Sequence, residues 1–196
     1  MGLHPVPEGH VAAVVTTLEM QKRPAARPMP PSPFRLVRWD APDPAKYRAL
    51  FARVGGPWLW YSRLVMDDAR LIALTHRPET QVQVVTDRAG VEVGLLELSH
   101  TTAALCMIDY FGLIPELTGA GHGRWLMAMA MALAWRPGVE CVRVNTCSLD
   151  HPSALNFYRA QGFEAVGRTV ETFADPRLIG VLDESLAPQV PLLRRR

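Results

Sequence analysis

The apolar residues near the N-terminus follow the two-residue period of β-strands. Residues 10–20 (HVAAVVTTLEM) are apolar and β-branched, which favours a strand. Residues 34–39 (FRLVRW) alternate between apolar and polar positions and predict a second strand. Residues 21–33 between them contain five prolines, and proline cannot donate a hydrogen bond to a strand ladder. This stretch is therefore expected to be a loop, and the two strands could pair with each other across it.

The next apolar residues recur with the period of a helix. Asp43 and Pro44 are a typical N-cap and first helical residue. Tyr47, Leu50, Phe51 and Val54 then fall at positions i, i+3, i+4 and i+7, which places them on one buried face. Gly55, Gly56 and Pro57 should end this helix. Asp67 and Asp68 could cap a second, short helix that runs to Leu74.

Apolar segments in the middle of the chain predict neighbouring strands and a central helix. Residues 81–86 and 91–100 flank a short polar turn and predict an antiparallel hairpin, and residues 103–114 predict a further strand. An uncharged run from Trp125 to Trp135 is rich in good helix formers. The remaining predicted elements are a strand at 140–146, a helix from 152 to about 161, a strand at 163–173 and a tail at 175–196.

The order of these elements predicts a mixed α+β fold. Strands joined by short turns should pair antiparallel, whereas the strands at 103–114 and 140–146 are joined by a helix and should be parallel. We therefore expect a central, mostly antiparallel sheet with one parallel pair and flanking helices. We divide the chain into an N-terminal strand with a proline-rich loop (1–33), a main domain (34–174) and a C-terminal tail (175–196).

Composition and charge exclude several classes of function. The chain of 196 residues is long enough for one domain with a sizeable core, and its net charge of +2 gives no electrostatic reason to expect nucleic-acid binding. Its longest apolar run has eleven residues, whereas a membrane span needs about 20. The N-terminus lacks the basic and then apolar layout of a signal peptide. We expect a cytoplasmic protein that does not bind membranes.

The cysteines predict no cross-link and no metal site. Cys106, Cys141 and Cys147 are odd in number and lack the spacing of zinc ligands. Cys141 and Cys147 are expected on one strand, six residues apart, which is too far for a disulfide. We expect three reduced, buried thiols.

A glycine-rich turn precedes the central helix. Gly119, Gly121 and Gly123 lie between a predicted strand and that helix. The backbone N–H groups at a helix start bind anions, and glycines let an anion approach them closely. No lysine follows as in a mononucleotide P-loop, and Arg124 stands where the dinucleotide fingerprint needs its third glycine. The remaining G-x-G-x-G pattern indicates either a phosphate site or a turn that only packs against its neighbours.

A second motif follows in residues 142–167 (VRVNTCSLDHPSALNFYRAQGFEAVG). Together the two motifs resemble motifs A and B of the GNAT (GCN5-related N-acetyltransferase) superfamily. Leu113 and Pro115 occupy the V-x-P positions before the three glycines, and the second motif is carried by Ala154, Tyr158, Gly162 and Phe163. Two positions depart from the pattern: Thr118 replaces the usual Gln or Arg, and His151 replaces the usual Asn.

The resemblance, which spans residues 34–173, implies an acyl-CoA N-acyltransferase fold in which the parallel strands splay apart around acetyl-CoA. It implies transfer of the acetyl group to a primary amine of a small molecule or peptide by direct attack in a ternary complex. The cofactor pyrophosphate would lie on the glycine turn, and the pantetheine arm would pair with the strand before it. The residues that this implies for cofactor binding are Leu113, Ile114, Thr118, Gly119, Gly121, His122, Gly123, Arg124, His151 and Tyr158.

The resemblance also implies a general acid. Tyr158 occupies the position where these enzymes often place a hydroxyl near the sulfur of the leaving thiolate; the alternative is a helix core residue. Candidates for the general base are Glu97 and Asp109 on neighbouring predicted strands, with a water chain to a backbone carbonyl as the alternative. His151 could donate to the cofactor or simply cap a helix.

The aromatic cluster at 58–61 could line the acceptor site. Trp58, Trp60 and Tyr61 follow a flexible glycine-proline turn, and in the related enzymes this region covers the acceptor; ordinary core packing is the alternative. A non-catalytic CoA-binding or interaction module of the same fold remains a second hypothesis, which Thr118 favours. A homodimer through the N-terminal strand or the tail stays open.

Overall fold

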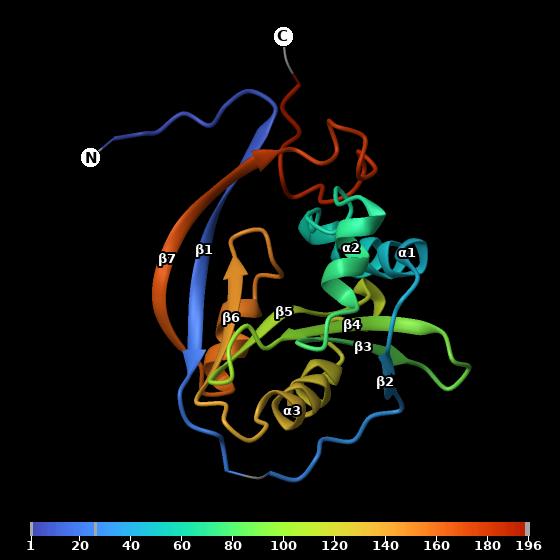
Figure 1. Ribbon diagram of the computed structural model, residues 1–196. Coiled ribbons are helices and arrows are strands. Elements are labelled where there is room, and N and C mark those ends of the chain that lie inside the picture. The colour runs from blue at the N-terminus through green and yellow to red at the C-terminus, as the bar shows by residue number, and fades with distance from the viewer. Residues whose placement is uncertain (1, 26, 195–196) are drawn as a thin grey trace.

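A computed structural model describes residues 2–25 and 27–194. Its centre is one seven-stranded sheet with the strand order β2-β3-β4-β5-β6-β1-β7. Figure 1 shows α3 on one face of this sheet and α1 with α2 on the other. The predicted mixed α+β fold, with a mostly antiparallel sheet and flanking helices, is confirmed. The strands are β1 (His10–Met20), β2 (Arg35–Trp39), β3 (Thr80–Thr86), β4 (Glu92–Ser99), β5 (Leu105–Leu113), β6 (Cys141–Cys147) and β7 (Glu164–Ala174).

One pair of neighbouring strands is parallel. Strands β2 to β5 form an antiparallel meander, and β5 then lies parallel to β6, as expected for two strands joined by a helix. The parallel pairing runs only from Leu105 with Cys141 to Ile108 with Val144. The rest of β5 has no strand partner on that side among the described residues, and this opening becomes the functional site.

Strand β1 corrects one expectation. It does not pair with β2 across the proline-rich loop but lies between β6 and β7, antiparallel to both. The side chain of Arg143 on β6 donates to the Glu19 carboxylate on β1, with an Nε–Oε1 distance of 2.8 Å. The segment between β1 and β2 crosses from one end of the sheet to the other (Figure 1). Residues 10–20 therefore complete the sheet that the main domain forms.

The first two helices begin at the predicted caps. In α1 (Pro44–Gly55), Asp43 Oδ1 accepts a hydrogen bond of 2.9 Å from the backbone N–H of Lys46. In α2 (Asp68–Thr75), Asp67 accepts in the same way from Arg70 at 2.7 Å. The predicted apolar face of α1 is buried and packs with Val82, Val84 and Leu95 from the sheet. A short 3-10 turn, η1 (Gly56–Trp58), follows α1.

The central helix α3 (His122–Ala134) begins three residues before the uncharged run and directly after Gly121. Trp125, Leu126, Met127 and Ala130 face the second apolar core, which β1, β4, β5 and β6 complete. A 3-10 turn, η2 (Pro115–Leu117), links β5 to the glycine turn. Helix α4 (Ala154–Ala160) is short and buries Tyr158.

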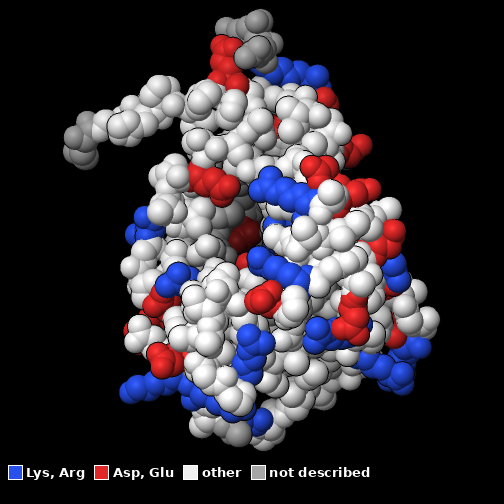
Figure 2. Space-filling model, in the orientation of Figure 1, with Lys and Arg blue, Asp and Glu red and all other residues white. Residues whose placement is uncertain are grey.

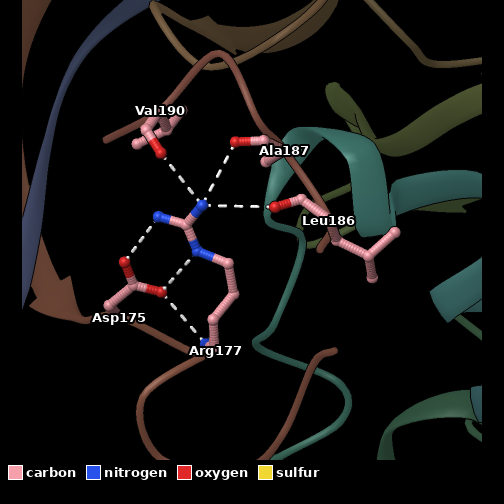
Figure 3. Close-up of polar contacts among 5 residues, drawn as sticks. All are labelled: Asp175, Arg177, Leu186, Ala187 and Val190. Atoms are coloured by element: carbon pink, nitrogen blue, oxygen red, sulfur yellow. Dashed lines mark hydrogen bonds and ion pairs between the residues drawn. The ribbon is translucent and has the colours of Figure 1, made fainter. Parts of the chain in front are cut away.

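The segment after β7 is packed onto the body of the protein. Arg177 is 3% exposed, and Figure 3 shows its guanidinium enclosed by the backbone. It donates to both carboxylate oxygens of Asp175 and to the carbonyls of Leu186, Ala187 and Val190, at 2.7–3.2 Å. Arg177 thus closes residues 175–190 into a folded loop, although the limit of the main domain at residue 174 remains a prediction.

This loop also touches the aromatic cluster. The side-chain amide of Gln189 donates to the carbonyl of Pro57 at 2.9 Å. A Cβ placed on Gly56 would lie 3.0 Å from Leu186. Leu59 packs in one apolar cluster with Leu182 and Ala187. The residues after β7 therefore hold η1 and the chain that follows it in place.

We expect Arg177→Met to destabilise the protein by about 3–5 kcal/mol. The substitution leaves the carboxylate of Asp175 buried and uncompensated, and three carbonyls lose their donor. Chemical denaturation would measure the difference. The matched control is Arg194→Met, which breaks an exposed pair with Glu184 and should cost at most about 1 kcal/mol. Equal losses in both variants would show that the buried pair is not the anchor of this loop.

Two further findings concern the described residues. No helix formed by them is long and apolar enough to cross a bilayer. All three cysteines are free thiols, but only Cys106 is fully buried, whereas Cys141 and Cys147 are partly exposed, so the expectation of three buried thiols was wrong for two of them.

Candidate functional site

A cavity of about 670 Å³ opens where β5 and β6 separate. Strand β5 forms one wall, and β6, β1 and β7 form the other. The glycine turn and α4 close one end, and residues 58–62 cover the other end. Most of the site residues expected from the sequence line it: Trp58, Trp60, Tyr61, Asp109, Leu113, Thr118, Gly119, Gly121, Gly123, Arg124, His151 and Tyr158.

Asp109 stands at an irregularity of the sheet. Glu97 of β4 is opposite Tyr110 and Leu98 is opposite Ile108, so Asp109 is the extra residue of a β-bulge. The bulge interrupts β5 directly after its last parallel pair, Ile108 with Val144. A bulge turns a side chain away from its regular direction, and here it brings Asp109 into the lining of the cavity.

The pKa of Asp109 suits proton transfer near neutral pH. Burial raises its pKa to about 6, a hydrogen bond from Ser99 acts in the opposite direction, and the charge of Glu97 raises it further. A group that titrates near neutrality can accept a proton and release it again. The structure therefore supplies one acidic side chain in the cavity with the pKa of a general base.

Glu97 lies outside the lining of the cavity. It is fully buried on β4, accepts a hydrogen bond from the Tyr47 hydroxyl and pairs with Arg63 Nη2 at 2.6 Å. The guanidinium of Arg63 in turn lies 4.9 Å from the centre of the Tyr110 ring. The predicted role of Glu97 as a base stays a prediction, and the side chain has no direct access to a ligand in the cavity.

The glycine turn has the backbone geometry of an anion site. Gly119 and Gly121 have φ values of 83° and 85°, which favour glycine strongly. Gly121 caps α3 without a side-chain hydrogen bond, so the first N–H groups of the helix keep their partial positive charge available. A Cβ on Gly119 would touch nothing within 4 Å, which leaves the turn open to a ligand.

Arg124 folds back over this turn. A Cβ placed on Gly121 would lie 3.3 Å from Arg124 Nη2, so the guanidinium faces the same space as the helix start. Thr118 also lines the cavity, and its hydroxyl donates to the carbonyl of Ile114 at 3.4 Å. Thr118 therefore replaces the long side chain of the usual pattern with a short one that bonds to its own loop, which leaves Arg124 as the cation of the site.

Two residues predicted to contact the cofactor, His122 and Ile114, do not line the cavity. The ring of His122 packs against Phe34 with ring centres 4.8 Å apart. Ile114 is also absent from the lining, and its N–H donates to the carbonyl of Val93. Leu113 lines the cavity from the unpaired edge of β5.

His151 is not the N-cap of α4, which is Ser153, but lies in the turn before this helix and lines the cavity. Its Nδ1 accepts hydrogen bonds from the backbone N–H of Ser153 at 3.1 Å and from the Ser153 hydroxyl at 2.7 Å. Because Nδ1 accepts from a backbone N–H, Nε2 carries the proton and is a donor. The ring also contacts Trp58 edge to face at 5.4 Å. The contact with Ser153 therefore leaves Nε2 of His151 free to donate to a ligand.

Tyr158 is 7% exposed and lines the cavity from α4. Burial, and next the charge of Asp150, raise the pKa of Tyr158 strongly, so the hydroxyl stays protonated at every pH of interest. Its ring packs against Phe111, Phe157 and Phe163. No residue in the described part of the chain accepts or donates a hydrogen bond at this hydroxyl, which is thus left for a ligand.

The aromatic cluster packs in the core and also lines the cavity, and its predicted contact with the acceptor stays a prediction. Trp60 packs on Gly55 and Gly112, where a Cβ would lie 2.3 Å and 3.2 Å from its ring, and it also lines the cavity. Tyr61 stacks on Phe173 with ring centres 4.5 Å apart. These side chains are core residues on one side and cavity wall on the other.

Several cavity residues were not predicted from the sequence. Tyr110 and Ser62, joined by a hydrogen bond between their hydroxyls, line the cavity near residues 58–62, and Glu171 and Phe173 on β7 line it as well. Glu171 lies in a strand that carries no sequence motif, so nothing in the sequence indicates that its side chain lines a cavity. Figure 2 shows Asp or Glu atoms at the bottom of a hollow on this face and on its rim toward β1 and β7. The structure holds no group of three or more His, Cys, Asp or Glu side chains that could bind a metal among the described residues.

Comparisons with known proteins agree with this geometry. The model of the acetyltransferase (GNAT) family matches residues 36–163. A GCN5-related N-acetyltransferase from Sphaerobacter thermophilus superposes with a TM-score of 0.60 at 17% identity, over 84% of this chain and 53% of that chain. A similar enzyme from Kribbella flavida gives 0.52 at 15% identity, over 88% and 63%.

A third solved structure is closer in length. It is an aminoglycoside acetyltransferase from an uncultured soil sample, with a TM-score of 0.56 at 20% identity, over 71% of this chain and 93% of that chain. The chain spans just over half of the Sphaerobacter protein and 63% of the Kribbella protein. No curated protein matches the sequence.

Proposed function

The chain belongs to the GNAT acetyltransferase family, and from this we propose that it transfers the acetyl group of acetyl-CoA directly to a primary amine of a small molecule or peptide in a ternary complex. The observation that carries the proposal is the cavity between the separated strands. It joins an anion-binding helix start at one end to an aromatic pocket at the other. Asp109 and Tyr158 lie between these ends.

The residues at the cofactor end fit the chemistry of CoA. The N–H groups after Gly121 and the guanidinium of Arg124 would bind the pyrophosphate. The unpaired edge of β5 from 109 to 113 would pair with the amide groups of the pantetheine arm as a further strand does. Acetyl-CoA supplies the activated acyl group, and the protein supplies position and proton transfer.

Asp109 and Tyr158 would serve the two proton transfers. The amine nitrogen attacks the thioester carbonyl and must lose a proton, which the carboxylate of Asp109 would accept. The carbon–sulfur bond then breaks, and the Tyr158 hydroxyl would donate to the departing thiolate. Both side chains line the cavity, and neither has an ion-pair partner among the described residues.

A second function class is favoured by one feature. Thr118 stands where the family pattern has a long polar side chain. A protein without that side chain would fit a module that binds CoA but does not transfer the acetyl group efficiently. A non-catalytic CoA-binding module would bind acetyl-CoA but turn over no amine.

One experiment separates these functions. Thermal denaturation with acetyl-CoA, CoA and longer acyl-CoAs tests binding, because a ligand at 100 times its Kd stabilises by about 2.7 kcal/mol. Release of free thiol is then followed with a panel of amines. Stabilisation together with amine-dependent thiol release supports the proposed enzyme. Stabilisation without release supports the binding module, and the absence of stabilisation contradicts both.

The pKa of Asp109 predicts the pH dependence of the reaction. Protonation of the free acceptor amine lowers kcat/KM at every pH below its own pKa of about 10. A general base must also be deprotonated, so kcat/KM should show an additional, steeper acidic limb as the pH decreases through about 6, the pKa of Asp109 in the free enzyme. Asp109→Asn should lower kcat/KM about 10²–10⁴-fold at pH 8 and remove this acidic limb. A pH profile from 5 to 9 with a saturating concentration of acetyl-CoA measures both effects. An unchanged acidic limb in Asp109→Asn would assign the base to another group.

A further inference from the structure

Glu171 places a negative charge in the cavity near the aromatic cluster at 58–61. It lies on β7, two residues before Phe173, on the strand face that also carries the stack of Phe173 with Tyr61. Burial and then the Glu171 carboxylate raise the pKa of Tyr61, and the same carboxylate contributes to the raised pKa of Cys147 on β6. Glu171 is an exposed residue that lines the cavity near Tyr61 and Cys147.

No cation of the described chain neutralises this carboxylate. Arg124 is the one Lys or Arg side chain in the described part of the chain that lines the cavity, and it lies at the glycine turn. The charges of Arg63 and Arg77 lower the pKa of Asp109, but neither side chain lines the cavity and each has a partner of its own. Arg63 pairs with Glu97 at 2.6 Å, and Arg77 Nε donates to the Thr80 hydroxyl at 2.7 Å.

Glu171 and Asp109 belong to opposite walls. In the strand order, β6 and β1 separate β5 from β7. Through the strand registers, Asp109 is level with Gly167, so Glu171 lies four residues, or about 13 Å, further along β7. Three strand spacings of about 4.8 Å add to this offset, and after the reach of both side chains the carboxylates lie on the order of 15 Å apart. One ammonium group cannot contact both. If Asp109 receives the proton of the reacting amine, Glu171 is left for a second positive charge on the same acceptor.

We propose that the acceptor carries a second cationic group, which binds Glu171 while its primary amine reacts next to Asp109. The apolar chain between the two nitrogens would lie along Trp58, Trp60 and Tyr61. This inference rests on the proposed acetyl transfer and names the acceptor class as diamines and larger polycationic amines. Glu171 is then the residue that sets acceptor specificity.

Three acceptors of equal chain length test the proposal. They are 1,10-diaminodecane, decylamine and 10-aminodecanoate, which are long enough to reach from Asp109 toward Glu171 and carry a positive, a neutral and a negative group at the far end. The kcat/KM of the diamine should exceed that of decylamine by up to about fivefold, as expected for an exposed ion pair, and aminodecanoate should have the lowest kcat/KM. Glu171→Gln should reduce the preference for the diamine to about one while the KM for acetyl-CoA stays unchanged.

Glu164→Gln is the matched control. It removes the same charge from an exposed position of the same strand outside the cavity, so it should leave the preference intact. Equal rates with the diamine and decylamine, or a preference that survives in Glu171→Gln, would overturn the inference. So would a preference for aminodecanoate, or an enzyme that binds acetyl-CoA but acetylates none of the three. Failure to bind acetyl-CoA would instead remove the proposed function.

Discussion

Gly121→Asp is expected to raise the Kd for acetyl-CoA by about 10²–10³-fold. The new carboxylate would occupy the space beside Arg124 Nη2, where the pyrophosphate should bind. Two like charges 4 Å apart near a protein surface repel by about 4 kcal/mol. The new carboxylate would also pair with the Arg124 guanidinium, which would then be unavailable to the pyrophosphate. Isothermal titration of acetyl-CoA into the purified variant measures the change.

Gly121→Asn is the matched control for shape. Asparagine has the same size as aspartate and tolerates the φ of 85° as well as any non-glycine residue does. Both variants should lose about 1 kcal/mol of stability through backbone strain. The Asn variant should retain much more of its affinity, because it adds no charge. Two folded variants with equal and unchanged affinity would show that the turn does not bind the pyrophosphate.

Tyr158→Phe is expected to lower kcat by about 10²–10⁴-fold with little change in the KM for acetyl-CoA. The substitution removes only the hydroxyl, which is the group that would donate to the thiolate. The ring contacts with Phe111, Phe157 and Phe163 remain, and no described residue loses a hydrogen-bond partner. The melting temperature should therefore stay close to that of the parent protein.

Tyr61→Phe serves as the control for the loss of a hydroxyl from the same cavity. Tyr61 lies at the acceptor end, stacked on Phe173, so its variant should change the acceptor KM more than kcat. Steady-state kinetics with one acceptor and saturating acetyl-CoA separate the two variants. A Tyr158→Phe enzyme that turns over at the parent rate would exclude the role as general acid.

Local patterns in the sequence determined most of the elements and the glycine turn at one end of the cavity. The spacing of Tyr47, Leu50, Phe51 and Val54 depends only on the turn of the helix, and the structure buries that face. The motif from Leu113 to Arg124 is likewise a local matter of strand, turn and helix start. Family membership followed from these contiguous segments, since their geometry requires no distant partner.

The tertiary structure decided which strands meet and which distant side chains share the cavity. β1 pairs with β6 and β7, because the apolar pattern of a strand shows that one face is buried but not beside which neighbour. The bulge that brings Asp109 into the cavity depends on the register between β4 and β5. The sequence of either strand alone does not show this register. Glu97 and Asp109 looked equivalent in the sequence, yet one is sealed behind Arg63 and the other lines the cavity.

The end of the cavity proposed to bind the acceptor depends most on long-range contacts. Glu171 enters the cavity only because β7 pairs with β1 in the register that sets Glu171 opposite Ala13. Residues 175–190 read as a tail in the sequence, since their composition has no periodic pattern. Their fold depends on one buried guanidinium, that of Arg177, which joins carbonyls up to thirteen residues away. Local propensity identifies helices, strands and binding turns, whereas buried charges and strand registers are decided by partners that the sequence pattern does not identify.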